Sequence, residues 1–292
     1  MKEKIYFILS MIIFGAVGVF AKWIEISSGK IALFLSLIGV FFLLLVFVWT
    51  RQRVSWGSVK KNAAALLAAS IAMCGNWIFL FQAYKETTIA SAALSYYFAP
   101  VLVIMLSPVV LKEKLSIKKA ICIGVALVGL YFIVQNASEE TTGHHLLGIG
   151  YGLVAAGFYA GLTLVGKFIR DLDGLANTLL QLGLSVVMLS AFVLVTEGFQ
   201  LGSVTGNTVI MLLVLGIVHG GIGFYLYFAG MKGLNAQSIA VLSYIDPLTS
   251  LLISVLVIGE KMTLLQLVGA VLLLGSIWVG ESGREQGKFE TG

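Results

Sequence analysis

Two stretches of this chain, 147 residues apart, repeat the same pattern. Residues 81–116 read FQAYKETTIASAALSYYFAPVLVIMLSPVVLKEKLS, and residues 228–263 read FAGMKGLNAQSIAVLSYIDPLTSLLISVLVIGEKMT. A shift of 147 places Ser91 on Ser238, Tyr97 on Tyr244, Pro100 on Pro247 and Glu113-Lys114 on Glu260-Lys261. Such a chain is expected to fold as two related halves, each built around the same apolar, proline-interrupted segment.

The repeat lies in sequence too apolar for a water-soluble domain. The chain is 59% hydrophobic and only 11% charged, whereas soluble domains carry about 25% charged residues. A bilayer crossing needs roughly 20 apolar residues, and ten runs of that kind occur. They are about 4–22, 31–50, 63–83, 88–111, 117–136, 147–168, 174–196, 208–230, 236–258 and 263–281. Because exposed sheet edges cannot face lipid, we predict an all-α integral membrane protein with ten transmembrane helices.

Two further features agree with this class. The first run follows Lys2 and Lys4 like a signal peptide, but no small-residue cleavage pattern follows it, so we expect a retained helix. Cys74 and Cys122 both lie in apolar runs, which indicates neither a disulfide framework nor a metal site.

The distribution of positive charge predicts the orientation. With the N-terminus inside, the inner segments carry 15 of the 19 Lys and Arg residues and the outer loops carry 4. The positive-inside rule therefore predicts that both termini are cytoplasmic. Five helices per half is an odd number, so the second half must enter the membrane upside down. We predict inverted repeats at 1–137 and 138–282, followed by a polar cytoplasmic tail at 283–292.

Inverted five-helix repeats are typical of secondary transporters that bind a solute between their halves. The pattern also resembles one family, the ten-helix EamA-type branch of the drug/metabolite transporter superfamily. The residues that carry the resemblance are the spacings from Pro100 to Glu113 and from Pro247 to Glu260. The resemblance implies a central cavity lined by the first, third, fourth, sixth, eighth and ninth helices. Many relatives have Trp-Gly in the first helix, where this chain has Phe14-Gly15.

Asp246 is the strongest candidate for a binding residue. It lies ten residues into the ninth predicted span. An ionisable group is costly to bury at that depth, so its presence there indicates a functional role. Pro247 follows it, and a proline opens the helix at the preceding turn, so Pro100 and Pro247 are candidate hinges. The carboxylate could hold a substrate ammonium or a proton. The alternative is that Asp246 binds local backbone groups at the kink.

His219 is the second candidate for proton coupling, because it lies midway along the eighth span and histidine titrates near neutral pH. It could equally donate one hydrogen bond between helices and never titrate. His144 and His145 fall in a predicted outer loop and are expected to be solvated.

Asn76 and Trp77 lie inside the third span, whereas the other tryptophans lie near span ends, as an aromatic belt predicts. A deep tryptophan beside an asparagine could form one wall of a substrate site or hold a cation against its ring. Helix packing, with Asn76 bonded to a neighbouring helix, is the alternative.

Several tyrosines are further candidates for substrate binding. Three flank the paired prolines and three lie on helices expected to line the cavity; they are Tyr96, Tyr97, Tyr244, Tyr159, Tyr225 and Tyr227. Their rings and hydroxyls suit an amphipathic solute, and they suit ordinary packing as well. Gln82 is a weaker candidate.

Charged residues at span ends are weaker candidates still. Lys22 and Lys167 end the first helix of each half and could attract anions, although lysines there more often extend to lipid headgroups. Glu113 and Glu260 are expected to stabilise a helix end or pair with a nearby lysine.

Taken together, these features predict a secondary transporter with no cofactor. The chain has no phosphate-binding Gly-Lys-Ser/Thr loop for ATP and no zinc-protease motif. A non-transporting receptor or scaffold, or a lipid-modifying enzyme, is the alternative. With Asp246 as the one charge near the midplane, the expected substrate is an amino acid or another cationic, zwitterionic or aromatic metabolite. Either proton exchange or facilitated export could move it, through a monomer or a homodimer, and no nucleic acid is expected to bind.

Overall fold

The computed structural model describes residues 2–22, 24, 26–52, 54–87, 89–134, 145–198, 205–253, 256 and 263–282. Within them the regular structure is helical. The helices are α1 (Lys2–Phe14), α2 (Val17–Lys22), α3 (Ser28–Trp49), α4 (Trp56–Glu86), α5 (Ile89–Tyr96), α6 (Ala99–Val110), α7 (Ile117–Val134), α8 (His145–Gly166), α9 (Gly174–Thr196), α10 (Gly206–Val214), the π-helix η1 (Leu215–Gly223), α11 (Phe224–Met231), α12 (Ala236–Leu242), α13 (Ile245–Ile253) and α14 (Leu264–Glu281).

The prediction of an all-α membrane protein is confirmed. Helix occupies each of the ten predicted spans, and among the described residues eight stretches are long and apolar enough to cross a bilayer. These eight are Ser28–Trp49, Trp56–Glu86, Ser91–Val110, Leu146–Gly166, Gly174–Thr196, Gly206–Met231, Ala236–Ile253 and Leu264–Glu281. Ten crossings and the inverted repeat stay predictions.

Four predicted spans are not single α-helices. The first is interrupted at Gly15-Ala16, and the eighth contains the nine-residue π-helix η1. The fourth and ninth are interrupted just before their prolines, because α6 begins at Ala99 and α13 begins at Ile245. The breaks at Pro100 and Pro247 lie where the missing backbone donor predicts them.

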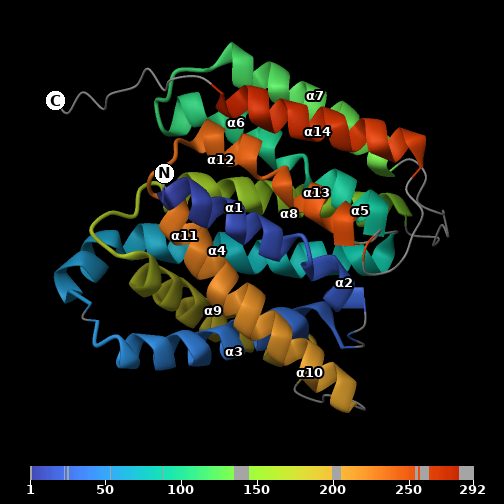
Figure 1. The fold of residues 1–292 in the computed structure, drawn as a ribbon. Coiled ribbons are helices and arrows are strands. Elements are labelled where there is room, and N and C mark those ends of the chain that lie inside the picture. The colour runs from blue at the N-terminus through green and yellow to red at the C-terminus, as the bar shows by residue number, and fades with distance from the viewer. Residues whose placement is uncertain are drawn as a thin grey trace.

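The helices form a layered bundle (Figure 1). Helices α7 and α14 pack against each other along one side, and α3 packs against α9 and η1 on the opposite side. Between them, α4 packs along α8, and α1 packs along α11. Helix α5 also contacts α8, while α13 contacts α1, so elements from the two halves alternate through the centre.

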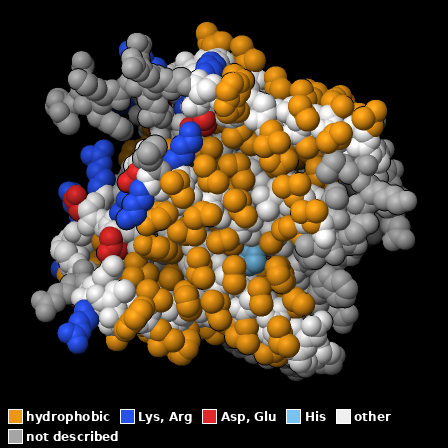
Figure 2. Space-filling view, in the orientation of Figure 1, with side chains coloured by type: hydrophobic (Ala, Val, Ile, Leu, Met, Phe, Trp, Pro, Cys, Tyr) orange, Lys and Arg blue, Asp and Glu red, His pale blue; other side chains and the backbone are white. Residues whose placement is uncertain are grey.

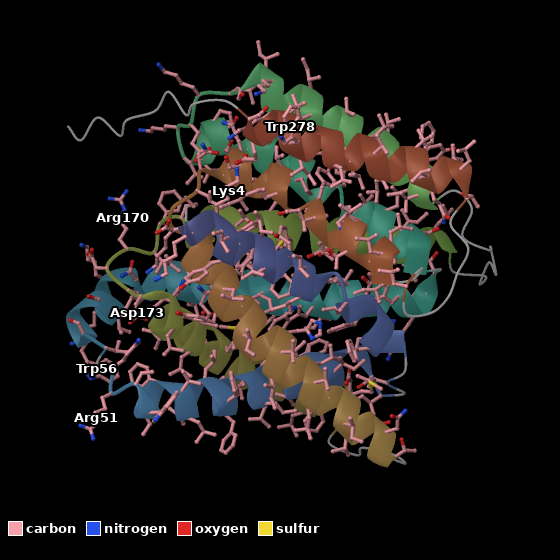
Figure 3. The ribbon with its side chains drawn as sticks, in the orientation of Figure 1. Lys4, Arg51, Trp56, Arg170, Asp173 and Trp278 are labelled. Carbon is pink, nitrogen blue, oxygen red and sulfur yellow. The ribbon has the colours of Figure 1, made fainter. Side chains whose placement is uncertain are left out.

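The surface has the character of a membrane protein. In the view of Figure 2, hydrophobic side chains cover the middle of the molecule, and the Lys and Arg side chains visible on this face lie toward its left end. Lys4, Arg51, Arg170 and Trp56 lie at this same end (Figure 3). The tryptophans at three predicted span ends are exposed: Trp49 at 85%, Trp56 at 77% and Trp278 at 74%. An apolar band beside a basic end fits a chain that spans a bilayer.

Asn62, near the start of α4, is hydrogen-bonded to the connection between α8 and α9. Its buried side chain donates to the Arg170 carbonyl at 2.7 Å and accepts from the Arg170 backbone N–H at 3.0 Å. Nearby, Lys61 and Asp171 form an exposed ion pair at 2.9 Å, which lowers the pKa of Asp171.

Replacing Asn62 with alanine is expected to lower the free energy of unfolding by about 2 kcal/mol, because both backbone groups of Arg170 lose their partner. Thermal unfolding of the detergent-solubilised protein measures this effect. Lys61→Ala is the matched control, and it should leave the unfolding temperature unchanged because exposed ion pairs contribute little. Equal unfolding temperatures for the Asn62 variant and the wild type would contradict this role.

Candidate functional site

A hydrogen bond between the two halves of the chain is the centre of the candidate site. The Tyr97 hydroxyl, between α5 and α6, donates to the Asp246 carboxylate at 2.7 Å. Tyr97 lies within the interruption that precedes Pro100, and Asp246 directly follows the interruption that precedes Pro247, so the two helix breaks bring them together. In the described part of the chain, the partner of this carboxylate is a hydroxyl from the other half and not the backbone of its own helix.

Close backbone packing holds Asp246 in place. Gly15, at the break between α1 and α2, lies against α13, and a Cβ there would be 2.6 Å from the Asp246 carbonyl oxygen. The Tyr244 hydroxyl makes a long, weak contact of 3.4 Å with the Tyr97 carbonyl. Because Gly15 has no side chain, the end of α1 can approach the start of α13, which carries Asp246, closely.

A tyrosine cluster extends from this pair along α8. The ring of Tyr96 lies 5.7 Å from that of Tyr97 and 5.8 Å from that of Tyr159. The Tyr159 hydroxyl lies 3.2 Å from the Ser243 hydroxyl, on the turn before Asp246. The ring of Tyr227 on α11 is 6.1 Å from that of Tyr159. We refer to Asp246, Tyr97, Tyr96, Tyr159 and Tyr227 as the Asp246–tyrosine cluster.

Residues that the sequence analysis did not single out complete the surroundings of this cluster. Thr163 is one helical turn after Tyr159, and its hydroxyl lies 2.9 Å from that of buried Tyr227. The ring of Phe14 contacts that of Phe224 at 4.9 Å and that of Tyr227 at 6.1 Å. Thr163 and Ser243 could have been found as hydroxyl residues in the same predicted spans as Tyr159 and Asp246.

Asn76 and Trp77 lie at the edge of the cluster. Asn76 is buried and donates to the Ala155 carbonyl of α8 at 2.9 Å, which is the helix-packing contact considered as the alternative. Trp77 is buried edge-on against Phe224, with ring centroids 5.2 Å apart. Both residues therefore stabilise the contacts that α4 makes with α8 and α11.

Two other candidates lie apart from the cluster, and a third, Tyr244, reaches it through the long contact with the Tyr97 carbonyl. Gln82 accepts from Ser28 at 3.1 Å and donates to Glu86 at 2.8 Å, in a separate polar group near the end of α4. Tyr225 is half-buried, and among the described rings it is not part of the cluster's contacts. Tyr244 is fully buried in apolar surroundings.

His219 also lies apart, within η1. Its ring is buried and contacts that of Phe20 edge-on at 5.6 Å. Among the described residues, neither ring nitrogen has a hydrogen-bond partner. Neighbouring Gly220 packs so closely on α3 that a Cβ would lie 2.6 Å from the Leu35 carbonyl oxygen. Both roles considered for His219, proton coupling and helix packing, stay predictions.

The charged residues at span ends have structural partners. Lys167 donates to the carbonyls of Met231, at 3.0 Å, and Leu234, at the end of α11. Glu113 accepts from the Ala236 backbone N–H at 3.0 Å, which confirms the expectation that it stabilises a helix end. The side chains of Lys22 and His145, and residues His144, Glu260 and Lys261, lie outside the described part of the chain.

The cluster offers one carboxylate, several hydroxyls and aromatic faces in an apolar environment. A carboxylate in such a setting favours a positively charged group, and ring faces attract cations electrostatically. The chemistry of the cluster therefore fits a solute with an ammonium group and an apolar part better than a phosphate or a dicarboxylate.

Comparison with known proteins gives a consistent family. The model of the EamA-like transporter family matches residues 1–135 and 146–279. The chain is 29% identical over 272 residues to the uncharacterized transporter YxxF of Bacillus subtilis, covering 92% of this chain and 86% of that protein. It is 28% identical over 274 residues to an uncharacterized transporter of Archaeoglobus fulgidus, covering 93% of each. A solved crystal structure with 17% identity matches its fold with a TM-score of 0.79, over 95% of this chain and 97% of that one.

Proposed function

The chain belongs to the EamA-like transporter family, and we propose that it moves a small cationic or zwitterionic organic solute across the cytoplasmic membrane by alternating access. Membership makes it a multi-pass membrane transporter. The solute class, the membrane and the transport cycle are the proposed part.

The observation that supports the solute class is the hydrogen bond from Tyr97 to Asp246. It lies between the halves and places the carboxylate beside the tyrosine cluster. A solute ammonium could take the position of the Tyr97 hydroxyl at the carboxylate, while the rings of Tyr96 and Tyr159 contact its apolar part. An amino acid or an aromatic amine has both groups.

The proposed cycle uses the two helix breaks as hinges. Residues 1–137 and 138–282 form the two inverted repeats, both termini are cytoplasmic, and the repeats rock about the breaks before Pro100 and Pro247. Two couplings fit this arrangement. In proton exchange, Asp246 releases a proton when the solute binds, with His219 as a second proton site. In facilitated export, Asp246 only holds the solute ammonium.

Uptake into liposomes tests the proposal. The purified protein is reconstituted, and labelled cationic, zwitterionic and anionic solutes are offered with and without an outward proton gradient, with the liposome interior more acidic than the bath. We expect at least one cationic or zwitterionic solute to enter faster than into empty liposomes, and anionic solutes to enter no faster. Acceleration by the gradient indicates proton exchange, and indifference to it indicates facilitated export. Transport of anions alone, or binding without uptake, would overturn the proposed solute class or the transport function, respectively.

A further inference from the structure

A dense polar network joins the two halves of the chain at the end of the bundle that carries Lys4 (Figure 3). The connection between α6 and α7 belongs to the first half, and it contacts the start of α12 in the second half. Ala236 donates its backbone N–H to Glu113 at 3.0 Å, and the Gln237 amide donates to the Lys114 carbonyl at 2.8 Å. The Ser116 backbone N–H donates to the side-chain amide oxygen (Oε1) of Gln237 at 2.9 Å. Three hydrogen bonds thus cross between the halves within a few residues.

Lys119 on α7 adds a second set of contacts between the halves. Its ammonium donates to Asn235 at 3.2 Å and to Ser238 at 2.5 Å, on either side of the start of α12. It also lies 3.8 Å from Glu281 at the end of α14, and Glu281 pairs with Lys4 at 2.7 Å. The side chain of Gln237 is buried, so its bonds are shielded from competing water.

The equivalent position in the second half is chemically different. The shift of 147 places Lys119 on Gln266, Ser116 on Thr263 and Gln237 on Ala90. The Thr263 backbone N–H donates to Gln266 at 2.9 Å, and the Gln266 N–H donates to Thr263 at 3.2 Å, which is a capping box within one helix. The Gln266 amide also donates to the Ile133 carbonyl of the first half at 3.3 Å, so one longer bond crosses between the halves here, and alanine replaces the bridging glutamine.

We propose that Glu113, Gln237 and Lys119 form a gate that holds this end of the transporter closed. The proposal rests on the alternating-access cycle proposed above. In that cycle the halves must separate at this end, so the hydrogen bonds from Gln237 must break each time. These bonds stabilise the state closed at this end in the empty protein, and by the predicted orientation this end is cytoplasmic.

A distance measured across the gate tests this proposal without any solute. Spin labels are attached at Ile117→Cys and Lys232→Cys, two exposed positions at this end that belong to different halves. Buried Cys74 and Cys122 are replaced by alanine. Pulsed electron paramagnetic resonance of the full-length protein in lipid then gives the population of short and long distances. We expect the short distance to dominate in this background.

Gln237→Ala should raise the ratio of long to short distances roughly tenfold, since it removes two hydrogen bonds that exist only when the gate is closed. Gln237→Asn, which keeps the amide but shortens the side chain, should give a smaller shift in the same direction. Gln266→Ala is the matched control, because it removes a capping contact and the longer bond to Ile133 at the opposite end without touching the gate residues, and its distances should not shift toward the long population. Unchanged distances in both Gln237 variants, or an equal shift in Gln266→Ala, would overturn the gate.

The readout separates this proposal from the proposed function. Because no solute is present, an error in the solute class leaves the distances interpretable. If the protein transports as proposed but the Gln237 variants show unchanged distances, the proposed function stands and the proposed gate is wrong.

Discussion

Asp246→Asn is expected to reduce transport of a cationic or zwitterionic solute at least about 100-fold in kcat/KM. The substitution keeps the size of the side chain and its ability to accept from Tyr97, but it removes the charge that balances a solute ammonium. Losing one partner of a buried charge pair costs several kcal/mol, and each 1.4 kcal/mol is a factor of ten. Initial uptake rates into liposomes, over a range of solute concentrations, give this ratio.

Asp171→Asn is the matched control for this experiment. It makes the same chemical change at an exposed carboxylate that pairs with Lys61 outside the predicted spans. Uptake by this variant should equal that of the wild type. If Asp171→Asn and Asp246→Asn lose transport equally, the loss reflects general charge or folding and not the proposed site.

Tyr97→Phe tests whether the solute ammonium displaces the Tyr97 hydroxyl from the Asp246 carboxylate. The variant keeps the ring next to Tyr96 and removes only the hydroxyl that donates to Asp246. If the solute ammonium displaces this hydroxyl, the variant should bind solute at least as tightly as the wild type while Asp246→Asn does not. Equal losses in the two variants would instead indicate that the hydroxyl and the carboxylate hold the solute together.

The helices and their breaks could be predicted from the sequence because each depends on local chemistry. Apolar runs of membrane length predicted where helix occurs, and the missing N–H of Pro100 and Pro247 predicted the interruptions before α6 and α13. The break at Gly15-Ala16 and the π-helix η1 were not predicted. Both depend on close contact with other helices, of α1 with α13 and of η1 with α3, which local sequence does not reveal.

The candidate site could be predicted only in part, because sequence gives the depth of a residue more readily than the direction in which it points. Asp246 is recognisable in the sequence as a charge at membrane depth. Its partner Tyr97 is 149 residues away, and the pairing of the two depends on how the two helix breaks meet in the fold. Gln82 lies near the end of its predicted span and belongs to a different polar group, with Ser28 and Glu86. Tyr225 and Tyr227 are two residues apart on one helix, so only one of them can face the cluster.

Gly129→Leu is expected to destabilise the protein strongly, by about 3 kcal/mol or more. Gly129 on α7 faces Gly269 on α14, in a pair of helices that lie side by side (Figure 1). A Cβ at Gly129 would lie 2.7 Å from the Gly269 carbonyl oxygen and 3.0 Å from the Leu272 Cβ. Backbone cannot move aside as a flexible side chain can, so the cost should reach the upper end of the range for overpacked interiors. Small residues at such contacts allow membrane helices to approach closely.

Gly124→Leu, on the same helix, is the matched control. A Cβ at Gly124 meets nothing within 4 Å, so the added side chain extends into open space. Leucine also favours helix over glycine by close to 1 kcal/mol, and this control should therefore be neutral or slightly stabilising. Thermal unfolding in detergent should show a Tm lower by roughly 5–10 °C for Gly129→Leu alone. Equal Tm values for the two variants would mean that α7 and α14 do not depend on this close approach. A difference of the expected sign would instead identify the glycine pair as the contact that joins the last helix of each predicted repeat.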